Sequence, residues 1–198
     1  MIVAFGDEPA LRPLCRWLSA LGEEVTALDP AAPVSEPAGW PSLAGISLLH
    51  VTGGALFGDA HAGVARSAVE AARAAGGAVS VDLSMDGFVV EDAARVAYRL
   101  AALRPAILFS APAVAEALEA PLAGLAEVPV LRLPGGGCRI FERRLPSLGG
   151  DGSPESSAAF TAAFCAAYLE GATPLEAGAR ALVMAAQAGA APARASLR

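Results

Sequence analysis

The chain has 198 residues, of which 55% are hydrophobic, and its formal net charge at pH 7 is −6. This length suits one domain with a sizeable hydrophobic core. The 14 basic side chains are all arginines, and no basic cluster interleaves with aromatic residues, which argues against a nucleic-acid partner.

Cysteine usage and the amino terminus indicate the compartment. The three cysteines, Cys15, Cys138 and Cys165, are far apart in the sequence and lie in apolar surroundings. They form no CxxC pair or His/Cys cluster, so we expect buried free thiols and no metal site. The chain starts without a basic region, and no apolar helix reaches the ~20 residues that span a bilayer. The sequence therefore predicts a cytoplasmic protein without a membrane partner.

Short apolar segments alternate along the chain with longer amphipathic ones, and glycines or prolines separate them. Brief apolar runs are typical of buried strands, and apolar residues at helical spacing are typical of helices. In chain order, the sequence predicts a strand at 2–5, a helix at 11–21, a strand at 25–28, a proline-rich loop at 29–41, a strand at 46–51, a helix at 64–75, a strand at 78–81, a helix at 91–103, a strand at 106–109, a short helix at 114–118, strands at 128–133 and 138–141, a glycine-rich loop with a long apolar helix at 148–171, and a last helix at 174–189. The glycine turn between the last two strands favours an antiparallel hairpin.

Strands that alternate with helices predict an α/β fold with a mostly parallel sheet and helices on both faces. The ligand sites of such sheets lie beyond the carboxyl ends of the strands. No G-x-G-x-x-G follows the first strand, which argues against a dinucleotide enzyme, and the absence of lysine excludes a Walker-type phosphate loop. The residues expected at the carboxyl edge are Gly6, Asp7, Gly53, Gly54, Asp82, Asp86 and the loop before the long helix.

Four passages, taken in order, resemble the PfkB/ribokinase family of carbohydrate kinases. They are LLHVTGGAL (48–56), AARAAGGAVSVDLS (71–84), AILFSAPAVAEAL (106–118), and VPVLRLPGGGCRIF (128–141) with DGSPESSAAFTAAFCAAYLEG (151–171). The last passage is similar to the family's strand pair, anion loop and catalytic helix. The resemblance implies one ribokinase-like domain over 1–198, a three-layer α/β sandwich that lacks the family's lid.

The resemblance also implies where a nucleotide and a substrate would bind. ATP and Mg²⁺ would be the cofactors, and the nucleotide would contact Gly135, Gly136, Gly137, Gly150, Gly152 and Ser153. A small polar ligand, such as a sugar or nucleoside, would contact Asp7, Gly53, Gly54 and Asp82. A homodimer is a further expectation.

At the positions that carry the family's reaction, this chain has different residues. The resemblance places Ala158 where the catalytic Asp belongs, and alanine cannot accept a proton. Residues 155–157 are Glu-Ser-Ser in place of Gly-Ala-Gly, and a glutamate there would repel a triphosphate. Ala111 and Val114 stand where Asn and Glu would help to organise magnesium. These differences predict impaired phosphoryl transfer.

Three functional hypotheses follow from this comparison. The first is a PfkB-type homologue, a pseudokinase, with a residual ligand-binding, structural or regulatory role and no catalytic residue. The second is an active ATP- and Mg²⁺-dependent sugar or nucleoside kinase in which a displaced carboxylate, that of Asp151, Asp82 or Asp7, removes the proton. Asp151 is a weak candidate for that base, and a solvated loop residue is the alternative. The third is a non-catalytic partner subunit of a kinase paralogue.

Other polar residues also have a structural interpretation. Residues 153–155, Ser-Pro-Glu, suit the start of a helix, because serine caps it, proline fits its first position and an acid favours its first turn. Arg139, Arg143 and Arg144 either face a phosphate or lie on the exposed face of the hairpin. His50 is expected to be a histidine of the core or its rim.

Overall fold

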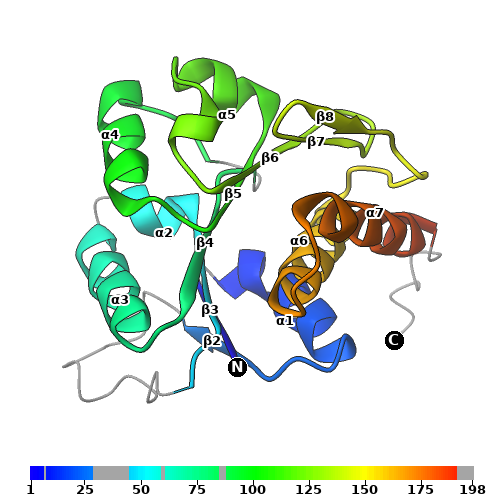
Figure 1. The fold of residues 1–198 in the computed structure, drawn as a ribbon, viewed down its shortest axis with the longest axis horizontal. Helices are drawn as coiled ribbons and strands as arrows, with labels where there is room; N and C mark the ends of the chain where they lie inside the picture. The colour runs from blue at the N-terminus through cyan, green and yellow to red at the C-terminus, as the bar shows by residue number, and fades with distance from the viewer. Residues whose placement is uncertain (7, 29–44, 59–60, 85–87, 191–198) are drawn as a thin grey trace.

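The computed structural model describes residues 1–6, 8–28, 45–58, 61–84 and 88–190. Asp7, Asp86 and the proline-rich segment 29–41 lie outside the described residues. Within the described part of the chain, eight strands form one sheet with helices packed on both of its faces (Figure 1).

The sheet has the strand order β2-β1-β3-β4-β5-β6-β7-β8. Strands β1 to β6 are parallel to one another, and β7 and β8 are antiparallel to their neighbours. All residues of β1, β3 and β5 are buried, because helices cover both faces of the sheet there. The strands are β1 (Ile2–Phe5), β2 (Val25–Leu28), β3 (Leu48–Thr52), β4 (Ala78–Asp82), β5 (Ile107–Ser110), β6 (Val128–Arg132), β7 (Cys138–Ile140) and β8 (Arg143–Leu145).

The helices form two layers (Figure 1). One layer contains α1 (Glu8–Ala20), α6 (Pro154–Leu169) and α7 (Pro174–Ala190), and the other contains α2 (Gly53–Phe57), α3 (Ala62–Ala74), α4 (Ala93–Leu103) and α5 (Pro112–Ala117). A separate cluster of buried apolar side chains lies under each layer. This arrangement confirms the predicted α/β sandwich with a mostly parallel sheet.

Helix α6 has more buried residues than any other helix of the described chain. Eleven of its 16 residues are buried, and six of those are alanines, which lets α1 and α7 pack close to its axis. Its two phenylalanines, Phe160 and Phe164, meet Phe109 of β5 edge to face, with ring centroids 6.4 and 5.4 Å apart. These contacts fix the helix against the middle of the sheet.

Some element boundaries differ from the prediction. Strand β3 begins two residues later than predicted, and Asp82 is the last residue of β4 rather than the residue after it. Helix α2 and strand β8 were not predicted, because Gly53 and Gly54 indicated a turn and the segment 143–145 contains no apolar run.

The cysteines are free thiols, with Cys138 and Cys165 buried and Cys15 half-buried. No helix among the described residues is both long enough and apolar enough to cross a membrane.

Candidate functional site

The start of helix α6 carries the backbone N–H groups that could hold an anion. Ser153 is the N-cap, and its hydroxyl accepts a hydrogen bond from the N–H of Ser156 at 3.2 Å. The N–H of Ser153 donates to the carboxylate of Asp151 at 3.0 Å. Pro154, at the first helical position, has no N–H to offer. In the described chain, the helix start therefore retains only the N–H of Glu155 for a ligand.

The side chain of Glu155 is bound to helix α1. Its carboxylate forms an ion pair with Arg16 and accepts a hydrogen bond from the indole N–H of Trp17 at 2.5 Å. This explains how an acid is accommodated in the first turn of α6, where the helix dipole also favours it. Glu155 thus links α6 to α1, which supports the structural interpretation of this residue.

Arg132 links the end of β6 to the first turns of α6. Its guanidinium donates to the carbonyl and hydroxyl oxygens of Ser157, at 3.1 and 2.9 Å, and lies 4.9 Å from the centre of the Phe160 ring. Ala158, one residue further along α6, is only 8% exposed and belongs to the apolar core cluster. The position that the resemblance gives to a catalytic acid is therefore occupied by a packed methyl group.

The two predicted glycine loops lie against each other. A Cβ atom on Gly136, whose φ is +85°, would approach the carbonyl oxygen of Gly150 to 2.5 Å. One on Gly137 would come within 2.9 Å of a backbone oxygen of β8. Gly135 and Gly152 have φ values of +80° and +72° with no atom within 4 Å of an added Cβ. The structure thus brings this predicted set together, and the glycines allow the loops to approach and turn.

Helix α7 covers the other side of the loop before α6. The hydroxyl of Ser156 donates to the carbonyl oxygen of Ala185 in α7 at 2.9 Å. A Cβ atom on Gly189 would come within 3.1 Å of the backbone nitrogen of Asp151. The loop is therefore in contact with the β6–β7 turn on one side and with α7 on the other.

Asp82, predicted to contact a substrate, accepts three hydrogen bonds from the protein. The side chain is 2% exposed. One carboxylate oxygen accepts from the N–H and hydroxyl of Ser84, at 2.7 and 2.6 Å, and the other accepts from the hydroxyl of Thr161 in α6 at 3.2 Å. Asp82 therefore joins the end of β4 to α6.

The predicted glycine pair lies at the same edge of the sheet. Thr52, which precedes it, is the register partner of Asp82. Gly53 starts α2, and a Cβ atom there would approach the rings and methyls of Phe88 and Leu83 to 2.8 and 2.9 Å. Gly53 thus lies beneath apolar side chains, while Gly54 is exposed in the same short helix.

A second group of buried polar side chains lies beside Asp82. The Nδ1 atom of His50 is 2.9 Å from the hydroxyl of Ser80, and its Nε2 atom is buried with no hydrogen-bond partner among the described residues. Burial lowers the pKa of His50, and the charge of Asp82 opposes that shift. Burial raises the pKa of the nearby Cys165 thiol to about 12. Sequence analysis placed His50 in the core or at its rim, and the structure places it in the core.

Asp151 is exposed on the loop before α6. Hydrogen bonds from Ser153 lower the pKa of this carboxyl group below its ordinary value. A carboxylate with a low pKa is a weak proton acceptor at neutral pH. Its position and pKa favour a role in the turn over that of a general base.

Several residues of this region carried no signal in the sequence. The ion pair of Arg16 with Glu155 joins residues 139 positions apart, and the Thr161–Asp82 hydrogen bond joins residues 79 positions apart. Such contacts arise from tertiary packing, so local patterns do not indicate them. No group of three or more His, Cys, Asp or Glu side chains within the described part of the chain is arranged to hold a metal ion.

No family model matches the sequence, and no curated protein matches it significantly. Solved structures do match the fold. The aminoimidazole riboside kinase of Salmonella enterica, in complex with aminoimidazole riboside and an ATP analogue, superposes with a TM-score of 0.72 at 13% identity, over 97% of this chain and 94% of that one. A PfkB protein from Polaromonas sp. JS666 gives 0.69 at 15% identity, over 94% and 95% of the two chains.

The chain has the PfkB/ribokinase-like fold. The adenosine kinase of Sinorhizobium meliloti gives a TM-score of 0.68 at 13% identity, over 92% of this chain and 83% of that one. At these identities the likeness establishes the ribokinase-like fold, and it confirms the resemblance found in the sequence at that level. The reaction has to be argued from the residues of this chain.

Proposed function

We propose that this ribokinase-like protein does not transfer phosphoryl groups and has a ligand-binding, structural or regulatory role. The observation that carries the proposal is the start of α6, where Ala158 is packed in the core and Asp151 and Ser153 occupy two of the N–H groups. Phosphoryl transfer depends on positioning and on charge stabilisation at such a site. Neither a base nor an open anion cradle is available there in the described chain.

Of the described carboxylates, neither Asp82 nor Asp151 is well suited to be the base of an active kinase. Asp82 is buried and accepts three hydrogen bonds. Asp151 is exposed, and its hydrogen bonds to Ser153 lower its pKa, which weakens it as a proton acceptor. Asp82 is better explained as stabilising the end of β4, and Asp151 as stabilising the turn before α6.

The ribokinase-like fold implies ATP and Mg²⁺, and the described residues do not fit them. A triphosphate would need several free N–H donors at the start of α6, whereas Ser153 and Asp151 already accept from two of them and Pro154 lacks one. Val114 is buried at one of the two positions to which the resemblance assigns magnesium ligation, and its side chain has no donor atom for a metal.

Thermal unfolding of the full chain tests the proposal. A ligand present at 100 times its Kd adds about 2.7 kcal/mol to stability, which raises the Tm of a chain of this size by roughly 5–10 °C. We expect no shift with ATP plus Mg²⁺ and no phosphorylated product from ribose or adenosine. A shift with adenosine or ribose alone would assign the protein a ligand-binding role.

Binding of ATP would instead raise the Tm. A Tm increase with ATP plus Mg²⁺, together with product formation that Asp151→Ala abolishes, would overturn the proposal in favour of an active kinase. Ser147→Ala, in the same exposed loop region, is the matched control, because among the described residues its hydroxyl accepts a hydrogen bond only from the N–H of Gly149. The homodimer expected from the sequence stays a prediction.

A further inference from the structure

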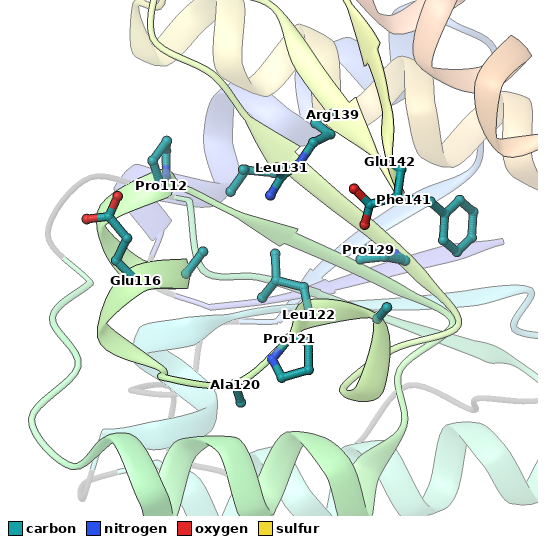
Figure 2. Close-up of a pocket in the computed structure, with 12 residues that line it drawn as sticks. Pro112, Glu116, Ala120, Pro121, Leu122, Pro129, Leu131, Arg139, Phe141 and Glu142 are labelled. Carbon is teal, nitrogen blue, oxygen red and sulfur yellow. The ribbon is translucent and has the colours of Figure 1, made fainter.

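A pocket of about 410 Å³ lies on the face of the sheet opposite α6 (Figure 2). Its volume is within the range of about 300–1,000 Å³ that is typical of small-molecule sites. The apolar part of its lining comes from the segment after α5 and from β6. The charged part comes from α5 and from the hairpin of β7 and β8, which we call the β7–β8 hairpin. The apolar lining includes Pro121, Leu122, Pro129 and Leu131, and the charged lining residues are Glu116, Arg139 and Glu142.

The pocket lies where the connection between β5 and β6 contains little helix. A crossover between parallel strands usually contains at least about a dozen residues with a full helix. Here it contains the six-residue helix α5 and a single 3-10 turn, Leu122–Gly124. These elements cover β5 and part of β6, while the hairpin beyond them stays open, and Phe141 at its turn is 45% exposed.

Two arginines stand side by side on the pocket face of the hairpin. Arg139 of β7 is the register partner of Leu131 on one side and of Arg144 on the other, so the three side chains form one cross-strand row. Like charges directly opposite each other in a sheet repel. Among the described residues, neither guanidinium has a hydrogen-bond or ion-pair partner. An anion at this point would relieve the repulsion.

Glu142 supplies an opposite charge on the same side of the pocket. Figure 2 shows its carboxylate and the Arg139 side chain on the hairpin side, with the apolar surface of Leu122 and Pro129 between the hairpin and α5. Within the described part of the chain, Glu142 also lacks an ion-pair partner. One arginine and one glutamate of the β7–β8 hairpin therefore face an apolar floor, and Glu116 of α5 lines the opposite side of the same volume.

We propose that this pocket binds a small zwitterion with an apolar body, that is, an apolar α-amino acid. The carboxylate of the ligand pairs with Arg139 beside Arg144, and its ammonium group pairs with Glu142. The apolar side chain covers Leu122 and Pro129. Because the pocket lies on the opposite face from α6, this binding is independent of the proposed loss of phosphoryl transfer.

Calorimetric titration of the full chain with L-phenylalanine tests the proposal, with two analogues that each lack one charge. N-acetylphenylalanine lacks the ammonium group, and phenethylamine lacks the carboxylate. A lost charge-assisted hydrogen bond at an exposed site costs about tenfold in affinity, so we expect both analogues to bind about tenfold more weakly than phenylalanine.

Substitutions assign the effect to the pocket. Arg139→Gln is expected to weaken phenylalanine binding about tenfold and to leave phenethylamine binding unchanged. Arg143→Gln is the matched control, because Arg143 pairs with Ile140, which belongs to the core cluster on the α7 side of the sheet. Arg143→Gln removes the same charge from the opposite face of the sheet and is expected to leave the affinity for both phenylalanine and phenethylamine unchanged.

Three results would overturn the proposal. The first is no detectable phenylalanine binding up to about 10 mM. The second is equal binding of phenylalanine and both analogues, which would indicate an apolar contact only. The third is an equal loss with Arg139→Gln and Arg143→Gln, which would indicate a general effect of net charge.

Discussion

Lowering the pH from about 7.5 to about 5.5 is expected to destabilise the fold through the buried His50. The ring is 1% exposed, and its Nε2 atom has no hydrogen-bond partner within the described chain. Burial disfavours the imidazolium form and lowers the pKa of His50 from the ordinary value of 6.5, while the charge of Asp82 acts in the opposite sense. The unfolded chain therefore binds a proton near pH 6.5 that the folded protein resists.

The magnitude follows from proton linkage. Because the folded-state pKa is the lower one, the stabilising contribution is present above pH 6.5 and is lost as the pH falls below it. If His50 stays neutral in the folded protein, the loss between about pH 7.5 and 5.5 is at most on the order of 1 kcal/mol. The chain contains two histidines, so His61 provides the comparison.

Urea unfolding at these pH values measures the effect. His50→Phe keeps an aromatic ring beside Phe109, and the loss of the bond to Ser80 lowers its stability equally at every pH. We expect the stability of this variant to change less between these pH values than that of the natural chain, by on the order of 1 kcal/mol. The control, His61→Gln, should retain the His50 component. An unchanged pH dependence in His50→Phe, or a natural chain that gains stability through His50 on acidification, would refute the reasoning.

Two further predictions concern the backbone and the thiols. Gly136→Ala should destabilise the protein by more than about 2 kcal/mol in urea unfolding, because the left-handed backbone costs about 1–2 kcal/mol and the added Cβ meets a carbonyl oxygen at 2.5 Å. Gly135→Ala, which has a similar φ and open space, should lose only the backbone part. Burial raises the pKa of Cys138 to about 11 and that of Cys165 to about 12. Iodoacetamide at pH ~8 should therefore label the half-buried Cys15 first and the other two cysteines only on unfolding, which mass spectrometry can measure. Rapid labelling of Cys165 in the folded chain would contradict this.

Most of the sheet could be predicted because its strands are buried on both faces and appear in the sequence as unbroken apolar runs. Where burial does not define the element, the prediction failed. Strand β8 contains Arg143 and Arg144, and it forms through pairing with β7 rather than through an apolar run. Helix α2 begins with Gly53, which favours turns, yet the close packing of Leu83 and Phe88 leaves room for no larger side chain there.

The candidate site could be located from the sequence, but the hydrogen-bond and ion-pair partners of its side chains could not be predicted. A glycine-rich loop before an apolar helix is a local pattern, so the start of α6 was correctly placed. The partners of its acids are not local, because Arg16 comes from α1 and Thr161 from the middle of α6. Sequence analysis therefore assigned Asp82 to a substrate, and the structure shows its carboxylate accepting hydrogen bonds from within the protein.

The start of α6 also shows which contacts stabilise this helix in the absence of a ligand. The free N–H groups at the start of a helix, which capping side chains accept from, are the same groups that would bind a phosphate. Each N–H group forms one good hydrogen bond, so a capped group is not available to a ligand. In this chain Asp151 and Ser153 accept from the N–H groups of Ser153 and Ser156, so two of these donors are already paired without a ligand. Ala158 adds to the apolar core in place of a carboxylate, whose burial would cost free energy. The substitutions that argue against catalysis therefore stabilise the helix on which a ribokinase-like active site would be built.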